Sequence, residues 1–228
     1  MSSPVTPPNR HLTLPSNPTS PSNASFFYRI TVGSKVSDDT LNLCAELFSS
    51  NYGIWGDEAS KVSHFTKAVG WVTQLVVDEA VHQCYVMTQL LQTLKVHAPF
   101  SCINIVGLVS SHPAACNALA KYAGADLKDV DLDFIRVHAN WILQSSPISY
   151  LNDAQLRGTL FEDNCDHGSI LSVFTKFYVN HAEPLRVLAS YQNKGQWCLG
   201  ELADGHEFLA IFPTVPVSPI EPIRFHKS

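Results

Sequence analysis

The sequence predicts an α/β fold, with a central sheet flanked by helices. Three observations indicate this: strand-like and helix-like segments alternate, the run 101–109 is apolar almost throughout, and the segment 113–122 begins with Pro113 and ends before Gly124. A continuous apolar run is typical of a buried strand. Proline in the first turn and glycine after the end are typical of a helix. Alternation of the two favours an α/β architecture.

The individual elements follow from apolar spacing along the chain. Strands carry alternating or continuous apolar residues, and helices carry them three and four positions apart. The predicted strands are 26–32, 70–77, 101–109, 170–179 and 207–213. The predicted helices are 41–48, 81–94, 113–122, 130–143 and 183–191, the first of them capped from Ser37, Asp38 or Asp39.

Proline marks both ends of the chain. Residues 1–25 combine six prolines with Ser, Thr and Asn, which predicts a disordered tail because such a segment buries too little apolar area to offset ordering. Residues 214–228 continue a proline that recurs every third position, which favours an extended Pro-rich C-terminal tail. The folded domain is therefore predicted over 26–213.

Composition excludes several classes of function. Fifteen basic residues against twenty acidic ones leave a net charge of -5, which argues against a nucleic-acid partner. The six cysteines form no C-x-x-C pair, so no zinc ribbon or redox motif is expected. No signal pattern and no apolar stretch of about 18 residues is found, so we expect a cytoplasmic protein without membrane contact.

The run 70–94, followed by 107–116, resembles the acetyl-CoA-binding core of GNAT-type N-acetyltransferases, and more narrowly a fungal GNAT-like group. The blocks 51–56, 130–136 and 200–208 extend this resemblance over most of the body. The resemblance implies a GNAT-like mixed central sheet flanked by helices. It also implies transfer of an acetyl group from acetyl-CoA to an amine of a small molecule or a protein.

In that family a strand leads into an R-x-x-G-x-G/A loop, which presents backbone N–H groups at a helix start to the cofactor's pyrophosphate. The resemblance places His82 at the arginine of this motif, Tyr85 at its first glycine and Met87 at its second small residue, so all three positions depart from it. The implied acetyl-CoA-binding residues are Gln74, Leu75, Val76 and Val77 for the pantetheine arm and His82, Gln83, Cys84, Tyr85 and Val86 for the pyrophosphate.

The acceptor side is implied by the aromatic and glycine-rich segment 51–56. Tyr52 and Trp55 either hold the acceptor or pack the preceding helix end, and His206 either faces the acceptor or belongs to a turn. No catalytic residue can be assigned, because Ala120 stands where the family has a tyrosine, with Tyr122 two positions away. The alternative is therefore a catalytically inactive GNAT-like domain with a binding role.

Only fourteen residues separate Gly56 from Trp71, where the family has a helix and a two-stranded hairpin. That number is too small for both, since strands average about 5–6 residues. We therefore expect the hairpin to be missing and a strand edge to be exposed. The N-terminal tail or a second copy of the chain would cover such an edge, which makes a homo-oligomer a prediction.

Two further clusters of polar residues have alternative interpretations. Ser110, Ser111 and His112 lie between a strand and a helix, where they can cap the helix or contact a ligand. A metal-dependent hydrolase would need a site built from His181, Glu183, His206 and Glu207. No H-E-x-x-H motif supports that site, so no metal is predicted.

Overall fold

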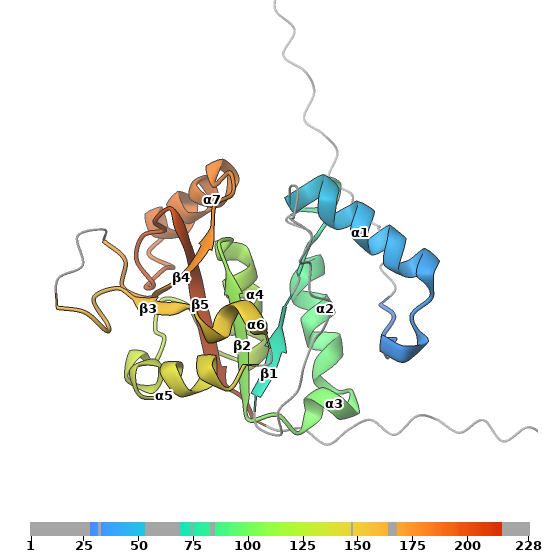
Figure 1. The fold of residues 1–228 in the computed structure, drawn as a ribbon, viewed down its shortest axis with the longest axis horizontal. Helices are drawn as coiled ribbons and strands as arrows, with labels where there is room; N and C mark the ends of the chain where they lie inside the picture. The colour runs from blue at the N-terminus through green and yellow to red at the C-terminus, as the bar shows by residue number, and fades with distance from the viewer. Residues whose placement is uncertain are drawn as a thin grey trace, which may run out of the picture.

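The computed structural model describes residues 28–31, 33–52, 69–73, 75–82, 85–146, 148–163 and 168–215 (Figure 1). Its strands are β1 (Val69–Val72), β2 (Ile105–Ser110), β3 (Gln155–Arg157), β4 (Ser172–Phe177) and β5 (Gly205–Pro213). Its α-helices are α1 (Asp38–Tyr52), α2 (Val86–Lys95), α3 (Ala98–Ser101), α4 (Pro113–Ala123), α5 (Leu132–Gln144), α6 (Ser149–Asn152) and α7 (Ala182–Asn193), with 3₁₀ turns at Gly33–Lys35 and Glu79–Val81. The predicted α/β class is confirmed.

The described strands form one mixed sheet in the order β1-β2-β5-β4-β3. β1 and β2 are parallel, and every other neighbouring pair is antiparallel. Parallel pairing of β1 with β2 brings their carboxyl ends to the same edge of the sheet. The chain leaving each strand passes into a helix on the same side, α2 after β1 and α4 after β2. Polar groups at these two helix starts are therefore neighbours in space.

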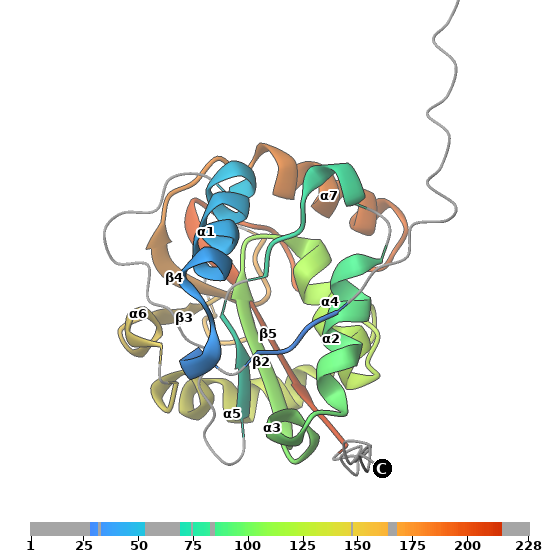
Figure 2. The same ribbon diagram turned by 90° about the vertical axis from the view of Figure 1, so that its right-hand side faces the viewer.

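Helices cover both faces of the sheet. Figure 2 shows α5 on one face and α2 and α4 on the other. The core between these layers is apolar and includes Trp71 of β1, Leu119 of α4, Ile142 of α5 and Phe212 of β5. Burial of such large side chains, at roughly 25 cal/mol per Å² of apolar surface, is the main favourable term in holding the layers together.

Close packing within the sheet explains Gly107 of β2. It pairs with Trp71 of the parallel neighbour β1. A Cβ atom at position 107 would lie 2.9 Å from the Trp71 ring. Because real Cβ contacts are not that short, a side chain at position 107 would force the indole to shift.

Helix α4 has the boundaries that the sequence predicts. Pro113 occupies its first turn, and the His112 side chain accepts a hydrogen bond from the Ala114 N–H at 3.2 Å. Gly124 ends the helix with φ +78°, a conformation that glycine adopts readily. Between these ends Cys116 and Leu119 are fully buried, so the helix is held both by its caps and by its apolar face.

Several predicted elements are wrong in extent or type. The strand predicted over 70–77 ends at Val72, and the helix predicted over 81–94 begins only at Val86, because a 3₁₀ turn and a left-handed residue, Tyr85, intervene. Residues 28–31 form no strand, since no neighbouring strand pairs with them. The strand predicted from 101 begins at Ile105, after α3. β3 and α6 have only three and four residues, too few for a periodic signal.

The side chains of the strand at the expected exposed edge are covered. β1 is the outermost described strand on its side of the sheet, yet Val69 and Trp71 are buried. The segment 53–68, where the hairpin is expected to be missing, lies outside the described residues. A homo-oligomer through this edge stays a prediction.

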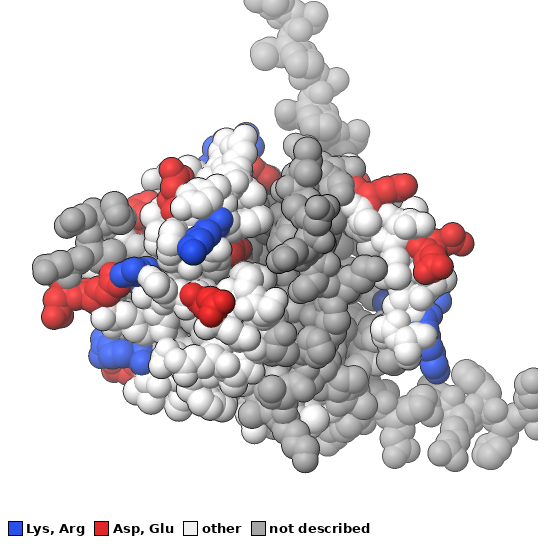
Figure 3. Space-filling view, viewed as in Figure 1, with Lys and Arg blue, Asp and Glu red and all other residues white. Residues whose placement is uncertain are grey.

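Charged side chains are dispersed over the surface. On the face seen in Figure 3, basic side chains lie among acidic ones, and the described residues form no continuous basic patch there. Nearby opposite charges include Arg136 with Asp133 at 2.8 Å and Lys128 with Asp126 at 3.4 Å. Exposed pairs of this kind contribute little to stability.

Candidate functional site

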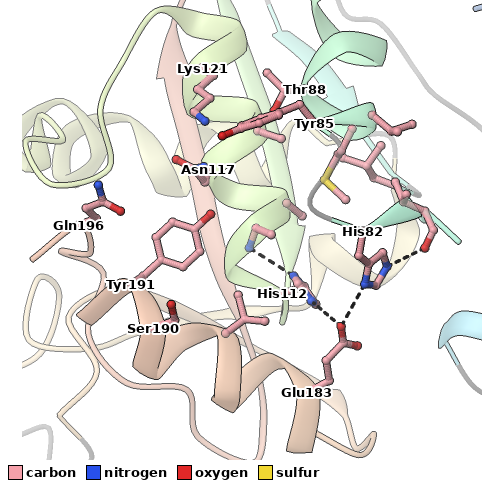
Figure 4. A pocket seen from close by; sticks show the side chains of 18 of the residues that line it. His82, Tyr85, Thr88, His112, Asn117, Lys121, Glu183, Ser190, Tyr191 and Gln196 are labelled. Carbon is pink, nitrogen blue, oxygen red and sulfur yellow. Dashed lines mark hydrogen bonds and ion pairs between the residues drawn. The ribbon is translucent and has the colours of Figure 1, made fainter. Parts of the chain in front are cut away.

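A groove of about 1050 Å³ lies beside the carboxyl ends of β1 and β2 (Figure 4). One wall is the segment from Leu75 to His82 with the first turn of α2, and the other walls are α4 and α7. Ligand sites in α/β sheets favour this position, outside the carboxyl ends of parallel strands. The volume is at the upper end of the roughly 300–1,000 Å³ typical of small-molecule sites.

The helical walls follow from side-chain spacing. On α4 the groove is lined at Ala114, Ala118 and Lys121, and on α7 at Glu183, Arg186 and Ser190 among others. Residues three, four and seven positions apart lie on one side of a helix. Each helix therefore presents one stripe of side chains to the groove. The α4 stripe consists mainly of small side chains, and the α7 stripe mainly of polar ones.

The start of α2 is a part of the groove wall that lacks a cap. Tyr85 precedes the helix with φ 58° and ψ 15°, and its side chain makes no capping hydrogen bond. Val86, Met87 and Thr88, the first helical turn, line the groove. The first N–H groups of a helix have no partner within the helix and carry partial positive charge. This part of the wall suits an anion.

The Tyr85 ring lies at the rim of the groove rather than in the core. Its side chain is 66% exposed. The Lys121 ammonium lies 5.3 Å from the ring centroid, within the range of a cation–π contact. The left-handed backbone of Tyr85 is a conformation that glycine adopts without the roughly 1–2 kcal/mol that other residues lose there.

Two histidines and one carboxylate converge at one end of the groove. The Glu183 Oε1 atom lies 3.6 Å from His82 Nδ1 and 3.6 Å from His112 Nε2 (Figure 4). The three side chains come from the segment after β1, the start of α4 and the first turn of α7. We name this group the His–Glu–His cluster.

Hydrogen bonds hold both rings of the cluster. The second nitrogen of His82, Nε2, lies 2.9 Å from the Val77 carbonyl oxygen. The second nitrogen of His112, Nδ1, accepts the Ala114 N–H. Burial lowers the pKa of His112, and the negative charge of Glu183 opposes that shift. His112 is therefore a mostly neutral ring with a fixed orientation.

Three cations line the rest of the groove. They are Lys121 of α4, Arg186 of α7 and Lys194 directly after α7, against the carboxylates of Asp126 and Glu183. The groove wall thus carries more positive than negative formal charge, although the whole chain is acidic. Such a local excess favours a ligand that bears phosphate or another anionic group.

A tyrosine hydroxyl also reaches the groove. Tyr191 of α7 lines it, and Figure 4 shows its hydroxyl directed toward Asn117 of α4. Burial raises the pKa of Tyr191, and a hydrogen bond with Asn117 partly offsets that shift. The phenol therefore stays protonated at neutral pH and can donate a hydrogen bond.

Most residues implied for acetyl-CoA lie together in the groove. Six of them line it: Leu75, Val76, Val77, His82, Tyr85 and Val86. Gln74, Gln83 and Cys84 lie outside the described residues. His82 contacts Glu183 and the Val77 carbonyl, two groups that the resemblance did not connect with it.

Of the three residues implied for the acceptor, the structure describes the side chain of His206 alone, and it does not line the groove. His206 is absent from its lining; its ring packs 4.9 Å from the Phe174 ring and its Nδ1 atom lies 2.9 Å from the Asp204 carbonyl oxygen. These contacts fit the turn interpretation. Trp55 lies outside the described residues, as does the side chain of Tyr52 at the end of α1.

Neither candidate for the family's tyrosine is available for chemistry. Ala120 is fully buried, and Tyr122 is 2% exposed with its pKa raised to about 12 by burial. The other nucleophilic side chain on this helix, Cys116, is also fully buried, and its pKa is likewise raised to about 12 by burial. Tyr122 and Cys116 therefore supply the groove with neither an acid nor a nucleophile.

Two of the four residues considered for a metal, Glu207 and Glu183, contact other groups. Glu207 is buried in β5 and accepts a hydrogen bond from the Thr175 hydroxyl at 2.8 Å, and Glu183 faces the two imidazoles of the cluster. Among the described residues, no three His, Cys, Asp or Glu side chains are arranged to hold a metal ion.

Comparison with protein-family models, curated proteins and solved structures found no match to this chain. Its function must be argued from the chemistry of the groove. No helix in the described part of the chain combines the length and the apolar character needed to cross a membrane.

Proposed function

We propose that this protein is an acetyl-CoA-dependent N-acetyltransferase and that the groove binds acetyl-CoA beside the acceptor amine. The observation that carries the proposal is the start of α2. After β1 and the 3₁₀ turn at Glu79–Val81, a left-handed residue, Tyr85, precedes an uncapped helix whose first turn lines the groove. Tyr85 is also the residue that the resemblance aligns with the first glycine of the pyrophosphate loop.

The groove offers partners for the phosphate groups and the pantetheine arm of this ligand. The N–H groups at the α2 start suit the pyrophosphate. Leu75, Val76 and Val77 supply an apolar wall of suitable kind for the pantetheine arm. Lys121 and Lys194 are available to further phosphate groups. Residues and ligand therefore match in charge and polarity.

Bound acetyl-CoA would supply an activated thioester, from which an amine takes the acetyl group. The chain's own residues would hold the thioester and the amine side by side, which removes most of the entropic barrier to their reaction. Tyr191, whose hydroxyl stays protonated, is available as a hydrogen-bond donor within the same groove.

Calorimetric titration of the full chain with acetyl-CoA tests the proposal. We expect a dissociation constant in the micromolar range, about -8 kcal/mol. Dephospho-CoA, which lacks one phosphate, should bind more weakly because the groove wall carries cations. Absence of binding to a protein shown by circular dichroism to be folded would overturn the proposal.

A catalytically inactive domain that binds through the same groove is the second candidate. It is favoured by Ala120, which stands buried where the family has a tyrosine, and by the lack of a carboxylate on β1. This candidate expects acetyl-CoA to bind without transfer to any amine. Measuring binding and turnover on the same preparation separates the two.

A further inference from the structure

The His–Glu–His cluster joins three segments that are distant in sequence. Glu183 Oε1 is 3.6 Å from a ring nitrogen of each histidine, and Figure 4 shows both rings turned toward it. Neither ring is free to rotate away, since the other nitrogen of each is engaged by the backbone. The position of the protons in this cluster can therefore be deduced from the partners.

His112 presents a donor to Glu183. Its Nδ1 atom accepts the Ala114 N–H, so in the neutral ring the proton is on Nε2, the nitrogen that faces the carboxylate. His112 also caps α4, which fixes the ring relative to the helix. Glu183 thus has one side satisfied by a donor.

His82 presents an acceptor to the same carboxylate. A carbonyl oxygen can only accept, so the Nε2 atom 2.9 Å from the Val77 carbonyl must carry the proton of the neutral ring. Its Nδ1 atom then faces Glu183 with a lone pair. Two acceptors that face each other across 3.6 Å form a place where one additional proton is held by both.

We infer that Glu183 and His82 together take the proton from the ammonium group of the acceptor, and that His112 is a positioning residue that orients Glu183. This inference rests on the proposed acetyl transfer in the groove. It adds the base that the sequence did not reveal.

The ammonium of the acceptor gives one proton to the site between His82 Nδ1 and Glu183 Oε1. The neutral amine attacks the thioester carbonyl carbon, a C–N bond forms and the C–S bond breaks. The second proton leaves the new amide nitrogen for the departing thiolate. The proton held by the cluster then passes to solvent.

The exposure of the cluster suits such a path. The side chains of His82 and Glu183 are 36% and 41% exposed, and that of His112 is 19% exposed. An amine can therefore reach the carboxylate, and water can carry the proton away. Arg186, one turn further along α7, also lines the groove and adds a positive charge on the same helix as Glu183.

The test is acetyl transfer by the full chain to a panel of spermidine, tyramine and a peptide with a free lysine, followed by release of the CoA thiol. Glu183→Gln should lower kcat about 100-fold or more at pH 7, in the range of general base catalysis. The dissociation constant for acetyl-CoA should stay unchanged. The defect should shrink as pH rises, because the amine then loses its proton to solvent without help.

Two further variants separate proton transfer from structure. His112→Asn keeps a good N-cap for α4 but removes the donor to Glu183, so kcat should fall about tenfold with an unchanged melting temperature. Glu201→Gln is the matched control: it neutralises an exposed carboxylate that bonds Gln192 of α7 and is absent from the groove lining, so turnover should be unchanged.

The outcomes separate the inference from the proposed function. Failure to bind acetyl-CoA overturns both. Binding without transfer to any amine of the panel overturns the inference and leaves binding intact. Transfer that is unaffected by Glu183→Gln, or lowered equally at every pH, assigns Glu183 a structural role and overturns the inference alone. His82→Gln serves as the second variant and should reproduce the pH-dependent defect.

Discussion

Helices α2 and α4 differ in how they begin, although each follows one of two parallel neighbouring strands and both start at the same edge of the sheet. The α4 start is closed: Ser110 accepts the His112 N–H at 3.1 Å, and His112 accepts the Ala114 N–H at 3.2 Å. The α2 start is open, with no capping side chain and a left-handed residue before it.

At one helix start, nearby side chains accept the free backbone N–H groups. At the other, these N–H groups are left for a ligand. A cap contributes about 1 kcal/mol to a helix, so its absence is a measurable loss of stability. At α2 that loss occurs where the first turn lines the groove, and at α4 the capping histidine also faces Glu183. The open start fits an anion-binding role, and the closed start fits a role in orienting a reacting group.

The largest expected effect is on the pH dependence of stability, and it comes from a carboxyl group buried in the core. Glu207 of β5 is 6% exposed and has one hydrogen-bond donor, Thr175. Burial raises its pKa to about 7 from 4.5. The folded state therefore holds the proton more tightly than the unfolded state, and stability should be greatest below about pH 4.5 for this group and fall as pH rises to 7.

The shift corresponds to roughly 3 kcal/mol at most, at 1.36 kcal/mol per pKa unit. Glu207→Gln cannot ionise and can still accept from Thr175, so the variant should be more stable than the unaltered protein above pH 7 and show a flatter pH dependence. Urea unfolding at pH 5 and pH 8 measures this. Glu201→Gln is the control, and equal slopes for all three proteins would show that Glu207 does not control the pH dependence.

The second effect places a charge at the open helix start. Thr88→Glu puts a carboxylate in the first turn of α2, where it should stabilise the helix by about 0.3–1 kcal/mol through the macrodipole. The same carboxylate would repel the pyrophosphate, so acetyl-CoA affinity should fall at least about tenfold, or 1.4 kcal/mol. Calorimetry and thermal unfolding measure the two changes. Thr88→Gln has the same size without the charge and should alter neither quantity strongly; equal binding by both variants would place the anion elsewhere.

The sequence predicted α4 and β5 well and the region between β1 and α2 poorly. Proline, a capping residue and glycine determine the ends of α4 locally, and β5 is a long apolar run in the middle of the sheet. By contrast, β1 ends where it diverges from β2, which depends on tertiary pairing. The apolar spacing of 81–94 continues across Tyr85, so periodicity did not reveal the left-handed residue there.

The sequence predicted the loop that lines the candidate site, but it did not predict the His–Glu–His cluster. Strand-to-helix order and the resemblance indicated Leu75, Val77 and His82, which do line the groove. Glu183 was considered only as a metal ligand and His112 only as a cap or ligand contact, because nothing in the spacing of residues 71 positions apart indicates that they meet. Their convergence arises from the position of α7 beside α4, which no local pattern encodes.

The smallest expected effect tests the left-handed residue itself. Tyr85→Gly removes the strain of a positive φ but loses the ring contact with Lys121 and adds freedom to the unfolded chain, contributions of about 1 kcal/mol or less each. The free energy of unfolding should therefore change by no more than about 0.5 kcal/mol. Acetyl-CoA affinity should rise several-fold, since the ligand gains access to the backbone and to the Lys121 ammonium.

Adding His82→Arg restores the family's cation but removes a member of the cluster, so binding should rise further while turnover falls.

Tyr85→Ala is the control that isolates the backbone. It removes the same ring and the same contact with Lys121, yet retains a Cβ atom in the left-handed conformation at φ 58°. Alanine should therefore be about 1 kcal/mol less stable than glycine at this position. If the two variants unfold alike, the segment before α2 relaxes without strain and does not have the geometry of a pyrophosphate loop. If they differ in stability but both bind acetyl-CoA more tightly than the unaltered protein, the tyrosine ring rather than the backbone limits access to the open helix start.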